Sequence, residues 1–325
     1  MRKMGLSISY RLITLAMLAI TAACGRPQTT GEATVSEIVW PQPDASLLPE
    51  GPHKQEVLYG EALVRRTYEL AGPAAADPNL RYAGNNLACS SCHLDGGRRR
   101  YGLSFIGVAG AYPRNMAREN AVQTLAQRIN GCFERSMNGR ALPEDSREMR
   151  AIIAYIGFLS EAAPAGLEGR GAPDVPLLDR PADPARGAQV YRTNCAVCHG
   201  ADGQGARNTG RPGYIYPALW GPDSFNTGAG MYRIITAANF IRANMPYGVT
   251  YETPRLTAEE AFDVAAYINV QTRPERGGLD RDYPDRARKP IDAPFPPYDD
   301  EFSQAQHRFG PWPPIQAARE ARTAR

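Results

Sequence analysis

Cys89-Ser90-Ser91-Cys92-His93 and Cys195-Ala196-Val197-Cys198-His199 are two copies of one motif, Cys-x-x-Cys-His, in a chain of 325 residues. The motif attaches c-type haem: each cysteine forms a thioether to a haem vinyl group, and the histidine binds the iron as proximal ligand. A single CxxC pair also suits zinc or redox chemistry. Two copies, each followed by a candidate sixth ligand and a closing helix, favour haem. The sequence therefore predicts a dihaem cytochrome c with two covalently bound haem c groups.

The bulk composition is consistent with two modest cofactor domains. The net charge of +3 does not suggest nucleic acid as a partner. The 31 glycines and 28 prolines are expected where long loops join short helices around a cofactor. A haem supplies apolar core that a small domain would otherwise lack.

The N-terminus has the pattern of an export signal, predicted over residues 1–24. Basic residues precede an apolar run over 12–23, which is too short to span a bilayer comfortably. The run ends Thr21-Ala22-Ala23-Cys24-Gly25, which resembles a bacterial lipobox whose cysteine becomes the lipid-modified first residue. Thr21 departs from the usual leucine, so ordinary cleavage after Ala23 is the alternative. We expect a periplasmic protein, anchored to a membrane as a lipoprotein through Cys24.

The fold expected is all-α, with two class I cytochrome c-like domains joined by a linker and flanked by extended N- and C-terminal arms. Ala154-Tyr155-Ile156 and Ala266-Tyr267-Ile268 occupy the same place in the two closing helices and indicate an internal repeat. A stretch rich in Pro, Gly and Asp separates the halves. The predicted limits are 25–51 for the N-terminal arm, 52–163 for the first domain, 164–183 for the linker, 184–274 for the second domain and 275–325 for the C-terminal extension.

Helices are predicted from apolar periodicity and capping signals. Residues 119–133 carry apolar side chains at helical spacing, and a following helix is expected to start near Asp145 with Glu148 completing a capping box. Thr257 and Glu260 form the same signal at the start of the last helix, which Pro274 stops. Further helices are expected over 54–70 and 184–194.

Met245 is the predicted sixth ligand of the second haem. It lies in the sequence Asn244-Met245-Pro246-Tyr247-Gly248, 46 residues after His199 and 22 before Tyr267. The alternative for Met245 is a core methionine, and Met231 is the weaker rival as ligand. His/Met ligation raises the reduction potential, which suits the haem from which electrons leave.

Cys132 is the predicted sixth ligand of the first haem. Of the six cysteines, four belong to the haem motifs and Cys24 to the leader, so Cys132 has no partner. It lies 23 residues before Tyr155, whereas Met137 lies 18 before it and Met116 lies 39. The alternative is a buried thiol. A thiolate lowers the potential, so we expect chemistry at the first haem. No spacing supports a bis-histidine site with His53 or His307.

Arg128, Cys132 and Ser136 are spaced four apart, so on a continued helix they would form one strip. Each arginine could instead be a solvated charge or a partner of a haem propionate. Arginines gathered around one haem nevertheless suggest an anionic substrate, because a guanidinium makes forked hydrogen bonds to oxyanions. The other arginines near in sequence are Arg114, Arg118, Arg135 and Arg140.

The sequence 86–93, the dipeptide Tyr112-Pro113 and above all the run Ile129-Asn130-Gly131-Cys132-Phe133-Glu134-Arg135-Ser136 resemble the dihaem thiosulfate dehydrogenases over roughly residues 52–273. The resemblance implies a periplasmic enzyme that couples two thiosulfates to tetrathionate and passes two electrons to a cytochrome or another high-potential acceptor. It implies substrate contacts at Arg118, Arg128 and Ser136.

Some members of that family have a lysine before the distal methionine that competes for the second iron. Asn244 stands at this place here, which favours plain His/Met ligation and catalysis in both directions, including tetrathionate reduction. Two alternatives for the function remain open. One is a dihaem electron carrier in which Cys132 only tunes the potential. The other is a sulfur-oxidising cytochrome that conjugates thiosulfate to a carrier protein.

Overall fold

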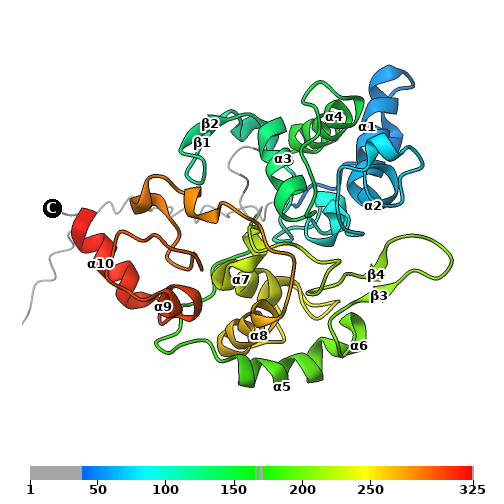
Figure 1. The fold of residues 1–325 in the computed structure, drawn as a ribbon. Coiled ribbons are helices and arrows are strands. Elements are labelled where there is room, and N and C mark those ends of the chain that lie inside the picture. Colours follow the sequence, from blue (N-terminus) through cyan, green and yellow to red (C-terminus); the bar gives the residue numbers. More distant parts are fainter. Residues whose placement is uncertain (1–38, 165–166, 168–170, 324–325) are drawn as a thin grey trace, which may run out of the picture. The chain divides into compact units, whose positions relative to one another are not determined.

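The computed structural model describes residues 39–164, 167 and 171–323. The predicted signal peptide, Cys24 and the first part of the N-terminal arm lie outside the described residues, as does part of the linker. The described chain is mostly helical, with the helices joined by long loops (Figure 1). The α-helices are α1 (Pro52–Arg65), α2 (Thr67–Leu70), α3 (Leu125–Arg135), α4 (Arg147–Glu161), α5 (Pro184–Asn194), α6 (Ala196–His199), α7 (Ile234–Asn244), α8 (Ala258–Val270), α9 (Gln304–Phe309) and α10 (Pro313–Thr323).

Short 3-10 helices and two antiparallel hairpins complete the architecture of the described residues. In the first hairpin β1 (Arg114–Met116) pairs with β2 (Ala121–Gln123), and in the second β3 (Ala206–Arg207) pairs with β4 (Tyr214–Tyr216). The 3-10 helices are η1 (Ala45–Leu47), η2 (Pro78–Leu80), η3 (Cys89–Ser91), η4 (Asp95–Gly97), η5 (Ala109–Ala111), η6 (Gly230–Tyr232), η7 (Leu279–Arg281) and η8 (Arg286–Arg288).

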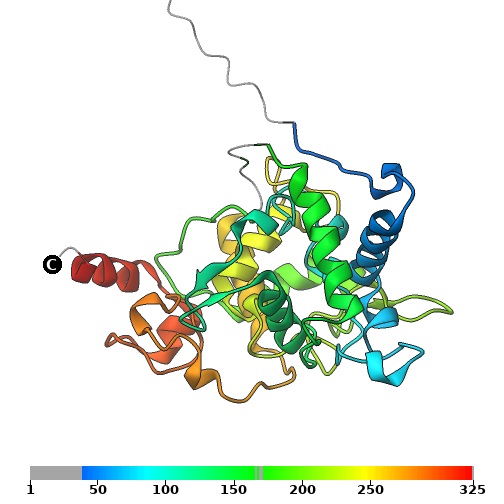
Figure 2. The same ribbon diagram turned by 90° about the horizontal axis from the view of Figure 1, so that it is seen from above.

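The internal repeat is visible in how the helices pack. α1 lies against α4 in the first half, and α5 lies against α8 in the second (Figure 1 and Figure 2). A glycine stands at each contact: a Cβ added to Gly60 would overlap the backbone carbonyl of Ala151, and one added to Gly187 would overlap that of Asp263. Only glycine allows the two backbones to approach so closely at these positions. Each helix pair supports its own hydrophobic core.

Several predicted element boundaries are confirmed and others are wrong. α5 spans the predicted 184–194, and Thr257 and Glu260 form the expected capping box of α8. The helix predicted over 54–70 is divided at Arg66, whose backbone is non-helical. The helix expected from Asp145 begins at Arg147, because Ser146 caps it and its hydroxyl accepts a hydrogen bond from the backbone N–H of Met149.

The helix predicted to begin at residue 119 begins only at Leu125 in the structure. Residues 114–123 form the first hairpin, with Asn120 in the left-handed region at φ 50°, and Val122 is exposed on β2 rather than buried on a helix. α3 begins only at Leu125, because Thr124 and Gln127 form a capping box there. Val122 matches the apolar period of α3 by coincidence of spacing.

The C-terminal extension is not simply an extended tail. It contains α9 and α10, and Trp312 and Ile315 are fully buried in the second core. The indole of Trp312 packs 5.3 Å from the ring of Phe262 on α8. The extension is therefore part of the second hydrophobic core. Among the residues that the structure describes, no helix combines the length and the apolar character needed to cross a bilayer.

Candidate functional site

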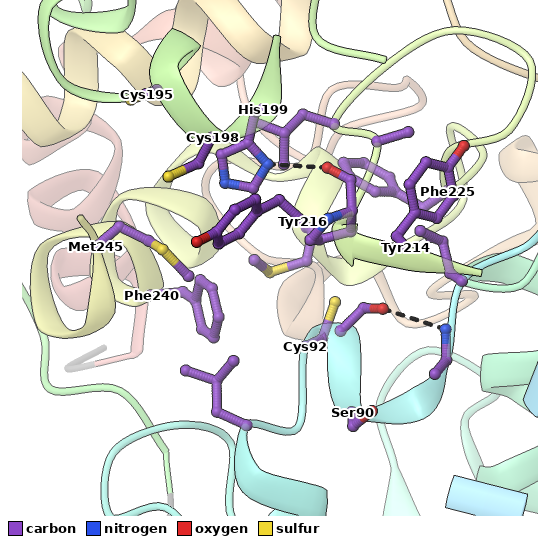
Figure 3. Close-up of a pocket in the computed structure, with 18 of the residues that line it drawn as sticks. Ser90, Cys92, Cys195, Cys198, His199, Tyr214, Tyr216, Phe225, Phe240 and Met245 are labelled. Carbon is purple, nitrogen blue, oxygen red and sulfur yellow. Dashed lines mark hydrogen bonds between the residues drawn. The ribbon is translucent and has the colours of Figure 1, made fainter. Parts of the chain in front are cut away.

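The side chains of each Cys-x-x-Cys-His motif line a separate cavity. The first cavity has a volume of about 370 Å³ and is lined by Cys89, Cys92 and His93. The second has about 350 Å³ and is lined by Cys195, Cys198 and His199 (Figure 3). Both walls are otherwise largely apolar, as a macrocycle with a hydrophobic periphery requires.

The two motif histidines are oriented in the same way. Nδ1 of His93 lies 2.6 Å from the carbonyl oxygen of Leu103, and Nδ1 of His199 lies 2.8 Å from that of Pro217. An Nδ1–H that donates to a carbonyl fixes the tautomer and leaves the lone pair of Nε2 free for a metal. Two thiols and one such imidazole in each cavity are the donor set that a c-type haem needs.

Cys132 lines the first cavity together with His93. It lies on α3, one turn after Arg128, whose Nη1 donates to the Cys132 sulfur at 2.7 Å. Burial raises the pKa of the Cys132 thiol, but the Arg128 guanidinium and the neighbouring His93 ring together outweigh burial, so the pKa falls to about 6. The same contact raises the pKa of Arg128 further. The protein therefore stabilises a thiolate at the one cysteine outside the haem motifs in the described chain.

The predicted strip on α3 is present. Arg128, Cys132 and Ser136 all line the first cavity, and Ser136 caps the C-terminal end of α3. Arg114 lines it as well, from strand β1. The sequence placed Arg114 near this haem but did not single it out from its neighbours.

Arg118 does not line either cavity. Its Nη1 donates to the carbonyl of Gly228 at 2.7 Å and contacts the Asp282 carboxylate at 3.3 Å. Arg135 makes a two-pronged contact with the same carboxylate, at 2.8 Å for each nitrogen–oxygen pair. Arg140 donates to the carbonyl of Asn79 and covers the ring of Tyr82. The carboxylate of Asp282, in the C-terminal extension, thus holds Arg118 and Arg135 outside the cavity of Cys132. Arg140 is held elsewhere, by Asn79 and Tyr82.

Met245 directly follows α7 and lines the second cavity, into which its side chain and the His199 ring both project (Figure 3). The rival ligand Met231 lines both cavities. Met137 lines the first cavity, whereas Met116 lies on β1 and lines neither.

His307 is fully buried, with its ring nitrogens 2.9 Å from the Ile291 carbonyl and the Asp300 carboxylate. The exposed His53 lines neither cavity.

The two cavities share part of their walls, a feature that the sequence did not reveal. The shared residues come from both halves of the chain: Leu87, Ala88, Cys92, Phe225 and Met231. The segment carrying Phe225 is bonded to the first half, since Asp223 accepts from the backbone N–H of Asn86 at 2.8 Å and Asn226 donates to the Glu134 carbonyl at 2.9 Å. Two haems in these cavities would be close neighbours.

Comparisons with known proteins agree with this geometry. Residues 81–165 match the family model described as SoxA/TsdA, cytochrome c domain, and residues 184–271 match the model described as cytochrome c. The chain is 43% identical to the thiosulfate dehydrogenase of Allochromatium vinosum, over 71% of this chain and 83% of that protein. It is 40% identical to that of Stutzerimonas stutzeri, over 72% of each chain.

A solved structure is similar as well. It is described as thiosulfate dehydrogenase TsdBA from Marichromatium purpuratum in its as-isolated form. The TM-score is 0.65 and the sequence identity 40%. The match covers 74% of this chain and 51% of that one, so this chain spans about half the length of that neighbour.

Proposed function

This chain belongs to the thiosulfate dehydrogenase family of c-type cytochromes with two covalently bound haems, and on that premise we propose that it joins two thiosulfates into tetrathionate beside the first haem. The observation that carries the proposal is the contact between Arg128 and Cys132 in the first cavity. It places a stabilised thiolate, the nucleophilic form of cysteine, beside a cation that attracts a dianion. When bound, the haems supply one-electron acceptors for the two electrons released.

His93 and Cys132 would hold the iron of the first haem, and His199 and Met245 that of the second. Each proximal histidine is already oriented by a backbone carbonyl. Cys132 and Met245 face the cavities that contain those histidines. A thiolate ligand gives the first haem a low potential and a thioether gives the second a higher one. This difference would favour electrons leaving through the second site.

The covalent step uses the sulfur of Cys132. A bond forms between this thiolate sulfur and the outer sulfur of one thiosulfate, and two electrons leave as the Cys132 S-thiosulfonate forms. The outer sulfur of a second thiosulfate then attacks the outer sulfur bound to Cys132. A sulfur–sulfur bond forms to give tetrathionate, the Cys132–sulfur bond breaks, and the bonding pair returns to the Cys132 thiolate. No proton is gained or lost.

The arginines lower the repulsion between the dianions that must meet. Arg128 and Arg114 both line the cavity and offer charge-assisted hydrogen bonds to sulfonate oxygens. Ser136, one turn beyond Cys132, adds a hydroxyl donor to the same wall. Arg118 would reach the substrate only after leaving Asp282, so we assign it a secondary role.

The direction and the setting are also part of the proposal. Asn244 offers no amine to compete with Met245, so the reaction should run in reverse as tetrathionate reduction when a strong reductant is present. A cytochrome or another high-potential acceptor would receive the electrons. We place the enzyme in the periplasm, attached to a membrane by a lipid at Cys24.

One assay separates this function from its two alternatives. Purified holoprotein is given thiosulfate and an artificial electron acceptor, and tetrathionate is measured as a product. Formation of one tetrathionate for each two electrons supports the proposal. Reduction of the protein without product identifies an electron carrier. Thiosulfate consumption only in the presence of a sulfur-carrier protein identifies a conjugating cytochrome.

A further inference from the structure

We propose that the loop over residues 99–103, which belongs to the first haem region, clamps the distal methionine of the second haem through Asn244 and Arg99. The inference rests on the proposed ligation by Met245. It assigns Asn244 and Arg99 as positioning residues, which act on the iron only through the segment that carries Met245.

The first half of the clamp is the side-chain amide of Asn244. Asn244 directly precedes Met245 and is 1% exposed. Its Nδ2 donates to the carbonyl of Phe240 and to the carbonyl of Tyr101, each at 3.0 Å. The Phe240 bond lies within α7, whereas the Tyr101 bond connects positions 143 residues apart in the chain. One amide therefore ties the end of α7 to the first haem region.

The second half of the clamp lies beyond Met245. Nη2 of Arg99 donates to the carbonyl of Val249 at 2.5 Å. The rings of Tyr101 and Tyr251 have centroids 3.8 Å apart, and the Arg100 guanidinium lies over both rings. The 99–103 loop thus contacts the methionine segment on both sides of the proposed ligand. A segment held at both ends loses few conformations when its thioether binds iron, which favours the bound state.

The loop is itself held in place. Tyr101 and Leu103 adopt left-handed backbone conformations, with φ of 58° and 55°. The carbonyl of Gly102 accepts from the backbone N–H of Leu94 at 3.0 Å. The carbonyl of Leu103 accepts from His93 Nδ1, the proximal histidine of the first haem. The same short loop therefore supports the proximal ligand of one haem and the distal ligand of the other.

The test measures how readily an external ligand displaces Met245 from ferric iron. Imidazole is titrated into oxidised holoprotein, and its binding is followed by loss of the near-infrared band that a His/Met haem shows. Arg99→Gln removes the bond to Val249, and Asn244→Ala removes the bond to Tyr101 together with the bond to Phe240 within α7. A net hydrogen bond is worth roughly a three- to tenfold change in an equilibrium. Imidazole should therefore bind each variant about three- to tenfold more tightly than wild type.

Arg255→Gln is the matched control, because Arg255 is exposed and lies just beyond the clamped segment. It should leave imidazole affinity unchanged. Wild-type affinity in folded Arg99→Gln, which alters a half-buried side chain, would overturn the clamp even if Asn244→Ala fails to fold. The Met245→Leu variant tests the ligation separately from the clamp. If the near-infrared band persists in this variant, the proposed ligation by Met245 is refuted. If the band is lost, the ligation stands, and the imidazole affinity of Arg99→Gln decides whether the clamp stands.

Discussion

The guanidinium of Arg128 donates to the sulfur of Cys132 across 2.7 Å, from one turn of α3 to the next. The contact joins a permanent cation to a thiol whose pKa it lowers, against the opposing effect of burial. Both side chains face the cavity that contains His93. This pairing makes the first site chemically different from the second, whose cavity is lined by the neutral thioether of Met245.

The two haems should differ in their sixth ligand. Low-temperature EPR and near-infrared magnetic circular dichroism of the oxidised protein should show one thiolate-type and one His/Met low-spin haem. Met245→Leu should remove the His/Met signature. Met231→Leu is the matched control and should retain it, because Met231 is assigned to the wall between the cavities. Two His/Met signatures in the wild type would refute the role of Cys132 as ligand.

Cys132→Ala should abolish tetrathionate formation while both haems remain covalently attached. The substitution removes the sulfur that forms the proposed bond to thiosulfate, and it leaves the four motif cysteines untouched. Steady-state assays with an artificial acceptor measure the loss, and the mass of the intact protein checks haem attachment. Activity within a few-fold of wild type would exclude Cys132 from the chemical step.

Arg128→Gln should lower kcat/KM more than Arg118→Gln. A lost charge-assisted hydrogen bond costs about 1.5–3 kcal/mol, or about ten- to a hundredfold in kcat/KM. We expect a loss of that size for Arg128, and a smaller one for Arg118, which is held by Asp282 away from the cavity. Arg140→Gln serves as control and should match wild type. An equal or larger loss at Arg118 would show that it leaves Asp282 to bind substrate.

Asn244→Lys should change the balance between thiosulfate oxidation and tetrathionate reduction. The substitution removes the hydrogen bond to Tyr101, and the new amine would compete with Met245 for the second iron. An amine ligand lowers the potential relative to a thioether. Potentiometric titration of the second haem and assays in both directions measure the effect. In the wild type both reactions should be detectable. The account fails if tetrathionate reduction is absent in the wild type and the lysine leaves the potential unchanged.

Trp312→Ala should destabilise the second haem region, although Trp312 lies far along the C-terminal extension. Its indole is fully buried against Phe262, and removal of a buried aromatic side chain costs about 3–5 kcal/mol. Denaturant unfolding followed by circular dichroism measures the change. Arg322→Ala, on an exposed part of α10, should change the free energy of unfolding by no more than about 0.5 kcal/mol. Equal stability of the two variants would mean that the extension contributes little to the core.

Local signals in the sequence determined much of this molecule. The haem motifs are contiguous, so their cysteines and histidine must lie together in any fold. The repeated Ala-Tyr-Ile sequences identified two closing helices, and these form as α4 and α8. The spacing of four between Arg128, Cys132 and Ser136 placed them on one face of α3, because a helix brings residues four apart to neighbouring positions.

Tertiary structure decided what depends on residues distant in the chain. Arg118 lies near the first haem motif in the sequence, but the carboxylate of Asp282, 164 residues away, holds it outside the first cavity. Phe225 and Met231 border both cavities only because the second half packs on the first. In the sequence, Asn244 indicates only that no lysine amine stands before Met245. In the structure, its side-chain amide donates to the Tyr101 carbonyl and so connects the two halves of the chain. The physical reason is that helix periodicity and capping act over a few residues, whereas burial and ion pairing depend on partners that only the folded chain brings together.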